Sequence, residues 1–270
     1  MTGGPARIAW ATTSGSSGKT TSTVTAAAIL AERGQRVLVV DGDWQMDASR
    51  WLGLDEAELP EDRHTLLDVL LDRDAVTDAI APSSLAGIDL LPSSPDLQDA
   101  ARLLAGTRGV EGQLRRALDT VEDRYDVILI DCRAGTEIPT VAGIVAATSV
   151  IGTTQAGLKE LRNTISLMDY VPAIADGYER PVHLAGILPC AVPAAGRAYR
   201  EALDLAQEVF GSHLLLPPVR RSVAVTEAHA ERAPLTARAR WSAVTDDYRA
   251  VVDELVNRGV IAAEATVASA

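Results

Sequence analysis

Residues 7–21 read RIAWATTSGSSGKTT, in which an apolar strand pattern runs through a loop of glycine, serine and threonine into a helical pattern. Backbone N–H groups of such a loop converge on phosphate oxygens where the helix begins, and glycine lets the backbone approach them closely. A lysine supplies charge to the phosphates, and a hydroxyl group serves a magnesium ion. These needs are met by Gly15, Gly18, Lys19 and Thr20. The stretch therefore predicts a phosphate-binding loop near the start of an α/β fold.

The strict phosphate-loop pattern has glycine at the position of Thr13, so the prediction depends on the strand-to-helix context as well as on the GKT tripeptide. Lys19 is also exceptional in this chain, because only it and Lys159 are lysines among 25 basic residues. The candidate nucleotide-binding residues of the loop are Gly15, Ser16, Ser17, Gly18, Lys19, Thr20 and Thr21.

Acidic residues follow two further apolar strand patterns. Asp41 and Asp43 come directly after Val37–Val40, and Asp131 follows Val127–Ile130. Carboxylates at the carboxyl ends of parallel strands face the crevice where ligands bind. We expect Asp131 to hold magnesium through water, with Thr20 and Asp41 as further candidate magnesium ligands, and Asp41 or Asp43 to orient an attacking water.

Strand and helix patterns alternate along the whole chain, and the strands are continuously apolar. This is typical of a doubly wound, mostly parallel sheet with helices on both faces, here as one domain over residues 1–270. We expect an acidic helical region at Asp55–Ala86 to present a solvated face. The expected strands are Arg7–Ala11, Val37–Val40, Ile88–Leu91, Val127–Ile130, Ser149–Thr153, Leu184–Leu188 and Leu214–Leu216, and the clearest helices are Thr20–Arg33, Leu158–Ala175 and Arg197–Phe210.

Composition excludes several classes of protein. The chain has 270 residues, 47% of them hydrophobic, and a formal net charge of −12, which excludes disordered, collagen-like and disulfide-scaffold proteins. No apolar stretch approaches the length of a membrane helix, and the amino terminus does not resemble a signal peptide. The tail after Arg258 has neither basic nor aromatic residues, so we expect a cytoplasmic protein that does not bind membranes.

Five segments, in order, resemble the ParA/MinD family of deviant-Walker ATPases, whose phosphate loop reads approximately KGGxGKTT. The resemblance covers nearly the whole chain. The segments are Ser14–Thr21, Asp41–Gln45, Leu91–Ser94, Asp131–Ala134, and Pro217–Ser222 with Glu227-Ala228.

The resemblance implies an ATP-dependent homodimer that uses magnesium and positions or partitions DNA or another cargo. Hydrolysis would be slow until a ParB-like protein or a cargo adaptor stimulates it. Lys19 would bind the β and γ phosphates of ATP or ADP, and Pro218 and Val219 would contact adenine.

Three positions depart from the family pattern. The lysine that reaches the other subunit's nucleotide is replaced by Ser14, and two prolines are replaced by Trp44 and Arg133. Two triphosphates facing each other in a dry dimer interface need compensating cations. Lys159 is the first candidate for that role and Arg133 the second.

The family often binds DNA without sequence preference, which requires basic side chains. Residues 220–240 carry five arginines and two glutamates, a local charge of +3 on an acidic protein. The candidate DNA-binding residues are Arg197, Arg200, Arg220, Arg221, Arg238 and Arg240. Two alternatives stay open: a phosphate-loop enzyme that activates a small amide or carboxylate substrate, and a switch that binds nucleotide with little hydrolysis.

Overall fold

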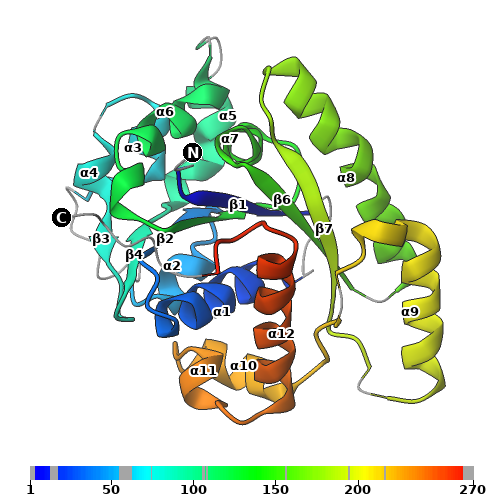
Figure 1. Ribbon diagram of the computed structural model, residues 1–270. Coiled ribbons are helices and arrows are strands. Elements are labelled where there is room, and N and C mark those ends of the chain that lie inside the picture. The colour runs from blue at the N-terminus through cyan, green and yellow to red at the C-terminus, as the bar shows by residue number, and fades with distance from the viewer. Residues whose placement is uncertain are drawn as a thin grey trace.

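The computed structural model describes residues 4–12, 18–54, 63–73, 75–104, 107, 109–155, 157–193, 195–215 and 217–263 (Figure 1). Five residues of the predicted loop, Thr13, Ser14, Gly15, Ser16 and Ser17, lie outside the described residues, as do residues 55–62 and 74 of the predicted acidic region Asp55–Ala86.

The described residues build one seven-stranded sheet in the order β3-β4-β2-β5-β1-β6-β7. Every neighbouring pair is parallel except β3 with β4, which is antiparallel. Parallel neighbours need crossover connections, and the helices between the strands provide them. The strands are β1 (Ala6–Ala11), β2 (Val37–Gly42), β3 (Ala81–Pro82), β4 (Ile88–Leu91), β5 (Val127–Cys132), β6 (Ser149–Gln155) and β7 (His183–Cys190).

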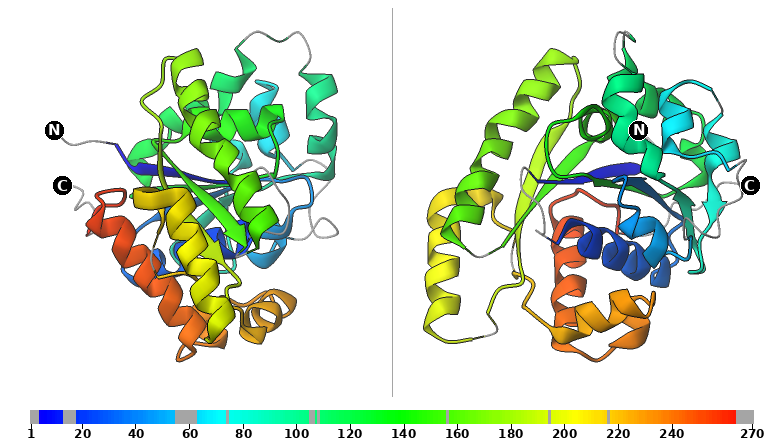
Figure 2. Two further views of the ribbon diagram at one scale, coloured as in Figure 1. Left: turned by 90° about the vertical axis from the view of Figure 1, so that its right-hand side faces the viewer. Right: turned by 180° about the vertical axis from the view of Figure 1, so that it is seen from behind.

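Helices cover both faces of the sheet (Figures 1 and 2). One face carries α1 (Lys19–Glu32), α2 (Asp47–Trp51), α10 (Val223–Ala230), α11 (Leu235–Arg238) and α12 (Ala243–Asn257). The other carries α3 (Leu66–Leu70), α4 (Val76–Ala79), α5 (Ala100–Leu103), α6 (Gln113–Asp119), α7 (Ile138–Ala146), α8 (Leu158–Gly177) and α9 (Arg197–Phe210). Short 3₁₀ turns lie at η2 (Pro95–Asp99), η3 (Val110–Gly112), η4 (Glu122–Arg124) and η5 (Gly211–His213).

Central strands are buried on both faces because their side chains alternate between two cores. In β5, Ile128 and Ile130 pack into the core under α7, whereas Val127 and Leu129 pack into the core under α1. This period of two explains why these strands read as continuous apolar runs rather than as alternating patterns.

The predicted fold class is confirmed, and so are six of the seven predicted strands, several of which extend further toward their carboxyl ends. The strand predicted at Leu214–Leu216 is wrong, because Leu214 makes only an isolated bridge to Ile187 and Leu216 lies outside the described residues. Strand β3 was not predicted, since it has two residues and one is Pro82.

The region at Asp55–Ala86 is less solvated than its charges indicate. Of its described part, α3 buries Leu66, Leu67, Val69 and Leu70 against the sheet. Among the described residues, no helix is both long enough and apolar enough to cross a bilayer.

We expect Leu129→Ala to lower the free energy of unfolding by about 2–5 kcal/mol, because Leu129 is fully buried in β5 and the substitution leaves a cavity. Leu103→Ala is the control, since Leu103 is 37% exposed, and it should cost less than about 1 kcal/mol. Urea unfolding of both variants checks this, and equal losses would contradict the assigned cores.

Candidate functional site

The site is built at the carboxyl edge of β2, β5 and β1. The parallel pairing of β2 with β5 places Asp41 beside Asp131 and Gly42 beside Cys132. A Cβ atom on Gly42 would lie 2.9 Å from the Asp131 carbonyl oxygen, so the close approach of the two strands requires glycine there. Both predicted acidic strand ends therefore meet at one place.

Helix α1 begins at the same edge. Gly18 precedes it with a φ of +91°, a backbone conformation that favours glycine. Thr20 then donates a 2.6 Å hydrogen bond from Oγ1 to Asp131 Oδ2, and Thr23 Oγ1 lies 3.5 Å from the other carboxylate oxygen. The structure thus brings the predicted hydroxyl and the predicted strand-end carboxylate together.

Burial disfavours the charged forms of Lys19 and Asp131, the two ionisable side chains at this edge. Lys19 is 8% exposed, and desolvation lowers its pKa despite the nearby carboxylates of Asp131 and Asp43. Desolvation, with the charge of Asp41, raises the pKa of Asp131 to about 8, against the opposing effects of Thr20 and Lys19. An anion beside Lys19 and a cation beside Asp131 would each favour the charged form.

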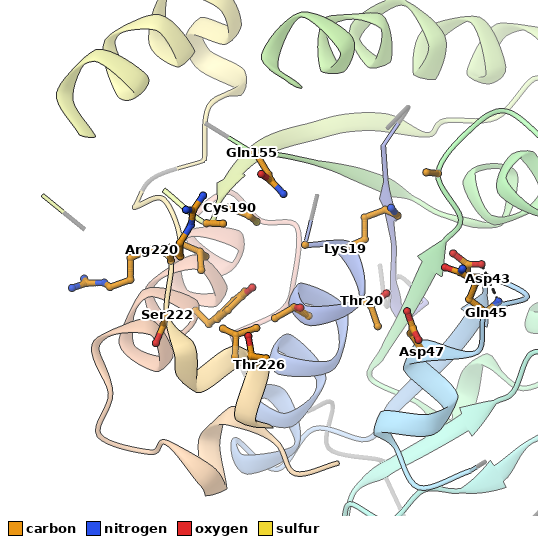
Figure 3. A pocket seen from close by; sticks show the side chains of 18 of the residues that line it. Lys19, Thr20, Asp43, Gln45, Asp47, Gln155, Cys190, Arg220, Ser222 and Thr226 are labelled. Atoms are coloured by element: carbon orange, nitrogen blue, oxygen red, sulfur yellow. Dashed lines mark hydrogen bonds between the residues drawn. The ribbon is translucent and has the colours of Figure 1, made fainter. Parts of the chain in front are cut away.

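A pocket of about 640 Å³ opens over these groups. Figure 3 shows Lys19 and Thr20 in its middle, Asp43 and Gln45 on one side, and Arg220, Ser222 and Thr226 on the other. The volume lies within the range of small-molecule sites. The lining residues are Gly18, Lys19, Thr20, Thr21, Asp43, Gln45, Asp47, Arg133, Ala134, Gln155, Cys190, Ala191, Val219, Arg220, Arg221, Ser222, Val225, Thr226 and Tyr248.

These residues fit a magnesium nucleotide. The buried lysine and the amino-terminal N–H groups of α1 suit phosphate oxygens, and a hydroxyl paired with a carboxylate suits a hard divalent cation. Val219, Val225 and Tyr248 give the other end of the pocket a less polar wall that suits a base. Pro218 is buried next to that wall but does not line the pocket.

Asp41, a predicted catalytic and magnesium-binding residue, does not line the pocket. It is fully buried, and its two oxygens accept hydrogen bonds from the Ser49 amide (2.8 Å), the Ser49 hydroxyl (2.6 Å) and the Asp43 amide (3.1 Å). Burial raises the pKa of Asp41 to about 6. Asp41 therefore anchors the segment after β2, and Asp43 is the carboxylate that faces the pocket.

The other predicted residues lie in different settings. Lys159 is exposed at the second position of α8, outside the pocket lining, although Gln155 just before it lines the pocket. Arg133 does line the pocket, so the second candidate cation is the one beside Lys19. Sequence reasoning missed Gln155 and Tyr248, since neither belongs to a motif and only folding brings them to the site.

Two of the predicted DNA-binding arginines are already neutralised. Arg220 makes two 2.6 Å contacts to the buried carboxylate of Asp247, and Arg238 pairs with both Glu227 and Glu231. Among the residues that the structure describes, Arg197 pairs with exposed Glu201 alone, a contact of small energy that phosphate can replace. For Arg200, Arg221 and Arg240, the described part of the chain supplies no carboxylate partner. Four of the six predicted DNA-binding arginines therefore remain available for phosphate: Arg197, Arg200, Arg221 and Arg240.

A strand, a lysine-bearing helix start and a strand-end carboxylate at the switch point of a parallel sheet define a P-loop nucleotide-binding protein. Comparison with known proteins agrees. A model of the AAA domain family matches residues 6–179. The chain belongs to this family, within the ParA/MinD group of P-loop ATPases.

Two curated relatives show the range of similarity. An uncharacterized protein of Mycobacterium tuberculosis is 35% identical over 94% of this chain and 80% of its own. The sporulation initiation inhibitor protein Soj of Bacillus subtilis is 28% identical, over 82% of this chain and 86% of its own.

Two solved structures are similar throughout. Apo McdA from Cyanothece superposes with a TM-score of 0.84 at 21% identity, covering 92% of this chain and 98% of its own, and shows the shared fold. Cobyrinic acid a,c-diamide synthase from Mycobacterium smegmatis, with bound ADP and magnesium, has a TM-score of 0.81 at 27% identity, covering 94% and 95%.

Lys19→Ala should weaken binding of magnesium ATP by about tenfold to a hundredfold, because it removes the buried cation at the pocket centre. Isothermal titration calorimetry measures this, with a thermal melt to confirm that the variant is folded. Affinity within twofold of the parent protein would contradict the assigned phosphate site.

The two aspartates after β2 should respond differently to alanine. Asp41→Ala leaves three donors without an acceptor, two of them in buried hydrogen bonds, and should lower the free energy of unfolding by at least about 2 kcal/mol. Asp43→Ala should cost less than about 1 kcal/mol but abolish most ATP turnover. Urea unfolding and phosphate release distinguish the two, and the reverse pattern would exchange their roles.

Proposed function

We propose that this chain binds magnesium ATP in the pocket over α1, hydrolyses it slowly, and couples the nucleotide cycle to partition or positioning of DNA or another cargo. One observation carries the proposal: the Thr20 hydroxyl lies 2.6 Å from Asp131, next to buried Lys19, at the carboxyl edge of a parallel sheet. The family membership supports the cargo-positioning role, since curated members include chromosome partitioning protein ParA of Caulobacter vibrioides.

Each side chain has a part in the chemistry. Lys19 would neutralise phosphate charge, Thr20 and Asp131 would hold the magnesium ion, and Asp43 would orient water from its place in the pocket wall. Bound magnesium supplies Lewis-acid polarisation of the phosphate oxygens. Val219, with Pro218 behind it, supports the base.

The site lies at an edge that a second copy of the chain can approach. Gln155 lines the pocket, and exposed Lys159 follows it at the start of α8. An ATP-dependent homodimer would bring this cation toward the partner's nucleotide. A ParB-like protein or a cargo adaptor would then stimulate hydrolysis and reset the cycle.

The surface we propose for non-specific DNA consists of Arg197, Arg200, Arg221 and Arg240. All four are exposed, and Arg240 lies over the ring of Trp241, which is 85% exposed and offers a stacking surface. Binding to this surface would place the protein on the nucleoid.

A second candidate function is a small-molecule synthetase, because cobyrinic acid a,c-diamide synthase is more similar in sequence than McdA at nearly equal structural similarity. That function needs a substrate in the pocket and has no use for Arg197, Arg200 and Arg240, which are exposed outside the pocket lining. A switch with little hydrolysis would keep the nucleotide site but lack turnover.

Retention on non-specific duplex DNA should require ATP and fall with salt. A double variant, Arg200→Ala with Arg240→Ala, should reduce the slope of log affinity against log salt by about two, because each lost phosphate contact contributes about 0.9. Arg238→Ala is the matched control, since two carboxylates already neutralise Arg238. No retention with any nucleotide would favour the synthetase.

A further inference from the structure

Two positions that depart from the ParA/MinD pattern contact each other at the pocket. The Arg133 guanidinium lies over the Trp44 ring, 5.4 Å from its centroid. Its Nε atom is 3.8 Å from Asp43 Oδ1, and its Nη1 donates to Glu137 Oε2. One aromatic face and two carboxylates therefore hold this guanidinium at the wall of the pocket.

The backbone explains why Arg133 is placed there. Gly42 and Cys132 are partners in the β2–β5 pairing, so the residues after each strand emerge side by side. The Thr140 hydroxyl donates to the Arg133 carbonyl at 3.0 Å. The Gly135 amide, at a φ of +120°, donates to the Thr12 carbonyl at 3.1 Å, which ties the Arg133 loop to the strand that leads into the phosphate loop.

The position of Arg133 indicates which part of a nucleotide it meets. Val219 and Val225, which give the less polar wall, lie close in the chain to Arg220 and Ser222. Figure 3 shows Arg220 and Ser222 at one end of the pocket and Asp43 beyond Lys19 at the opposite end. With the base at the first end and phosphates over Lys19, the terminal phosphate would lie toward Asp43 and the guanidinium beside it.

We propose that Arg133 binds the terminal phosphate of ATP from the same subunit and distinguishes ATP from ADP, with Trp44 as the positioning residue. This inference rests on the proposed nucleotide site. The guanidinium has five donors in a planar fork that matches phosphate oxygens. Glu137 is 57% exposed on its side chain, so its contact is weak and the phosphate can replace it.

The pairing also gives the three family departures a common physical account. The chain has Ser14 where the family has a cation directed at nucleotide, and Arg133 restores one positive charge at the phosphate end of the pocket. Trp44 supplies the flat surface that an arginine, unlike a proline, needs in order to be held there.

The test compares magnesium complexes of a non-hydrolysable ATP analogue and of ADP by isothermal titration calorimetry. Arg133→Ala should weaken analogue binding by about tenfold or more and change ADP binding less than about twofold. Arg133→Lys should fall between, because it keeps the charge and loses the fork. Trp44→Ala should reduce the preference for the analogue, whereas Trp44→Phe should retain most of it.

Arg102→Ala is the control, since Arg102 is exposed, pairs with Asp99 and lies outside the pocket. Equal effects of Arg133→Ala on both nucleotides, or no effect, would overturn the inference while leaving the nucleotide site intact. An effect that grows with a tenfold rise in protein concentration would overturn action within one subunit. Failure of the parent protein to bind either nucleotide would overturn both this inference and the proposed function.

Discussion

The parallel pairing of β2 with β5 brings Asp41 and Asp131 side by side at a buried edge, and much of the site follows from that constraint. Two neighbouring carboxylates in low dielectric repel each other, and burial disfavours the charge of each. The fold resolves this by separating their roles. Asp41 is surrounded by donors from Ser49 and Asp43, whereas Asp131 accepts from Thr20 and stays close to Lys19.

This separation gives the pocket its chemical character. Because both carboxylate oxygens of Asp41 accept hydrogen bonds, from Ser49 and from the Asp43 amide, Asp41 fixes the course of the segment after β2, and Asp43 faces the pocket. A cation would stabilise the charged form of Asp131, and an anion would stabilise the charged form of Lys19. A magnesium nucleotide supplies both, because its phosphates are anionic and its metal ion is a cation. Its binding would therefore offset the cost of burying the charges of Lys19 and Asp131.

The arginines that line this pocket differ in how strongly they are held by carboxylates. Arg220 is held by buried Asp247 and stiffens the wall near Val219, while Arg133 lies on Trp44 with only exposed or partly exposed carboxylates as partners. A guanidinium paired with a buried carboxylate stays in that ion pair, whereas one paired with exposed carboxylates can exchange them for a ligand. The same reasoning, applied to Arg197 and Arg238, separates available from neutralised charges on an otherwise acidic surface.

The sequence by itself determined the fold class, most strands and the elements that carry Lys19, Thr20, Asp43 and Asp131, because apolar periodicity and a strand-to-helix phosphate loop are local signals. It did not separate Asp41 from Asp43, since the two lie two residues apart and only the partner Ser49 distinguishes them. It also left Arg133 second to Lys159 as the compensating cation. Strand register and long-range contacts decided where these side chains lie, because they join residues such as Trp44 with Arg133, and Arg220 with Asp247, that are distant in the chain and whose pairing depends on tertiary packing.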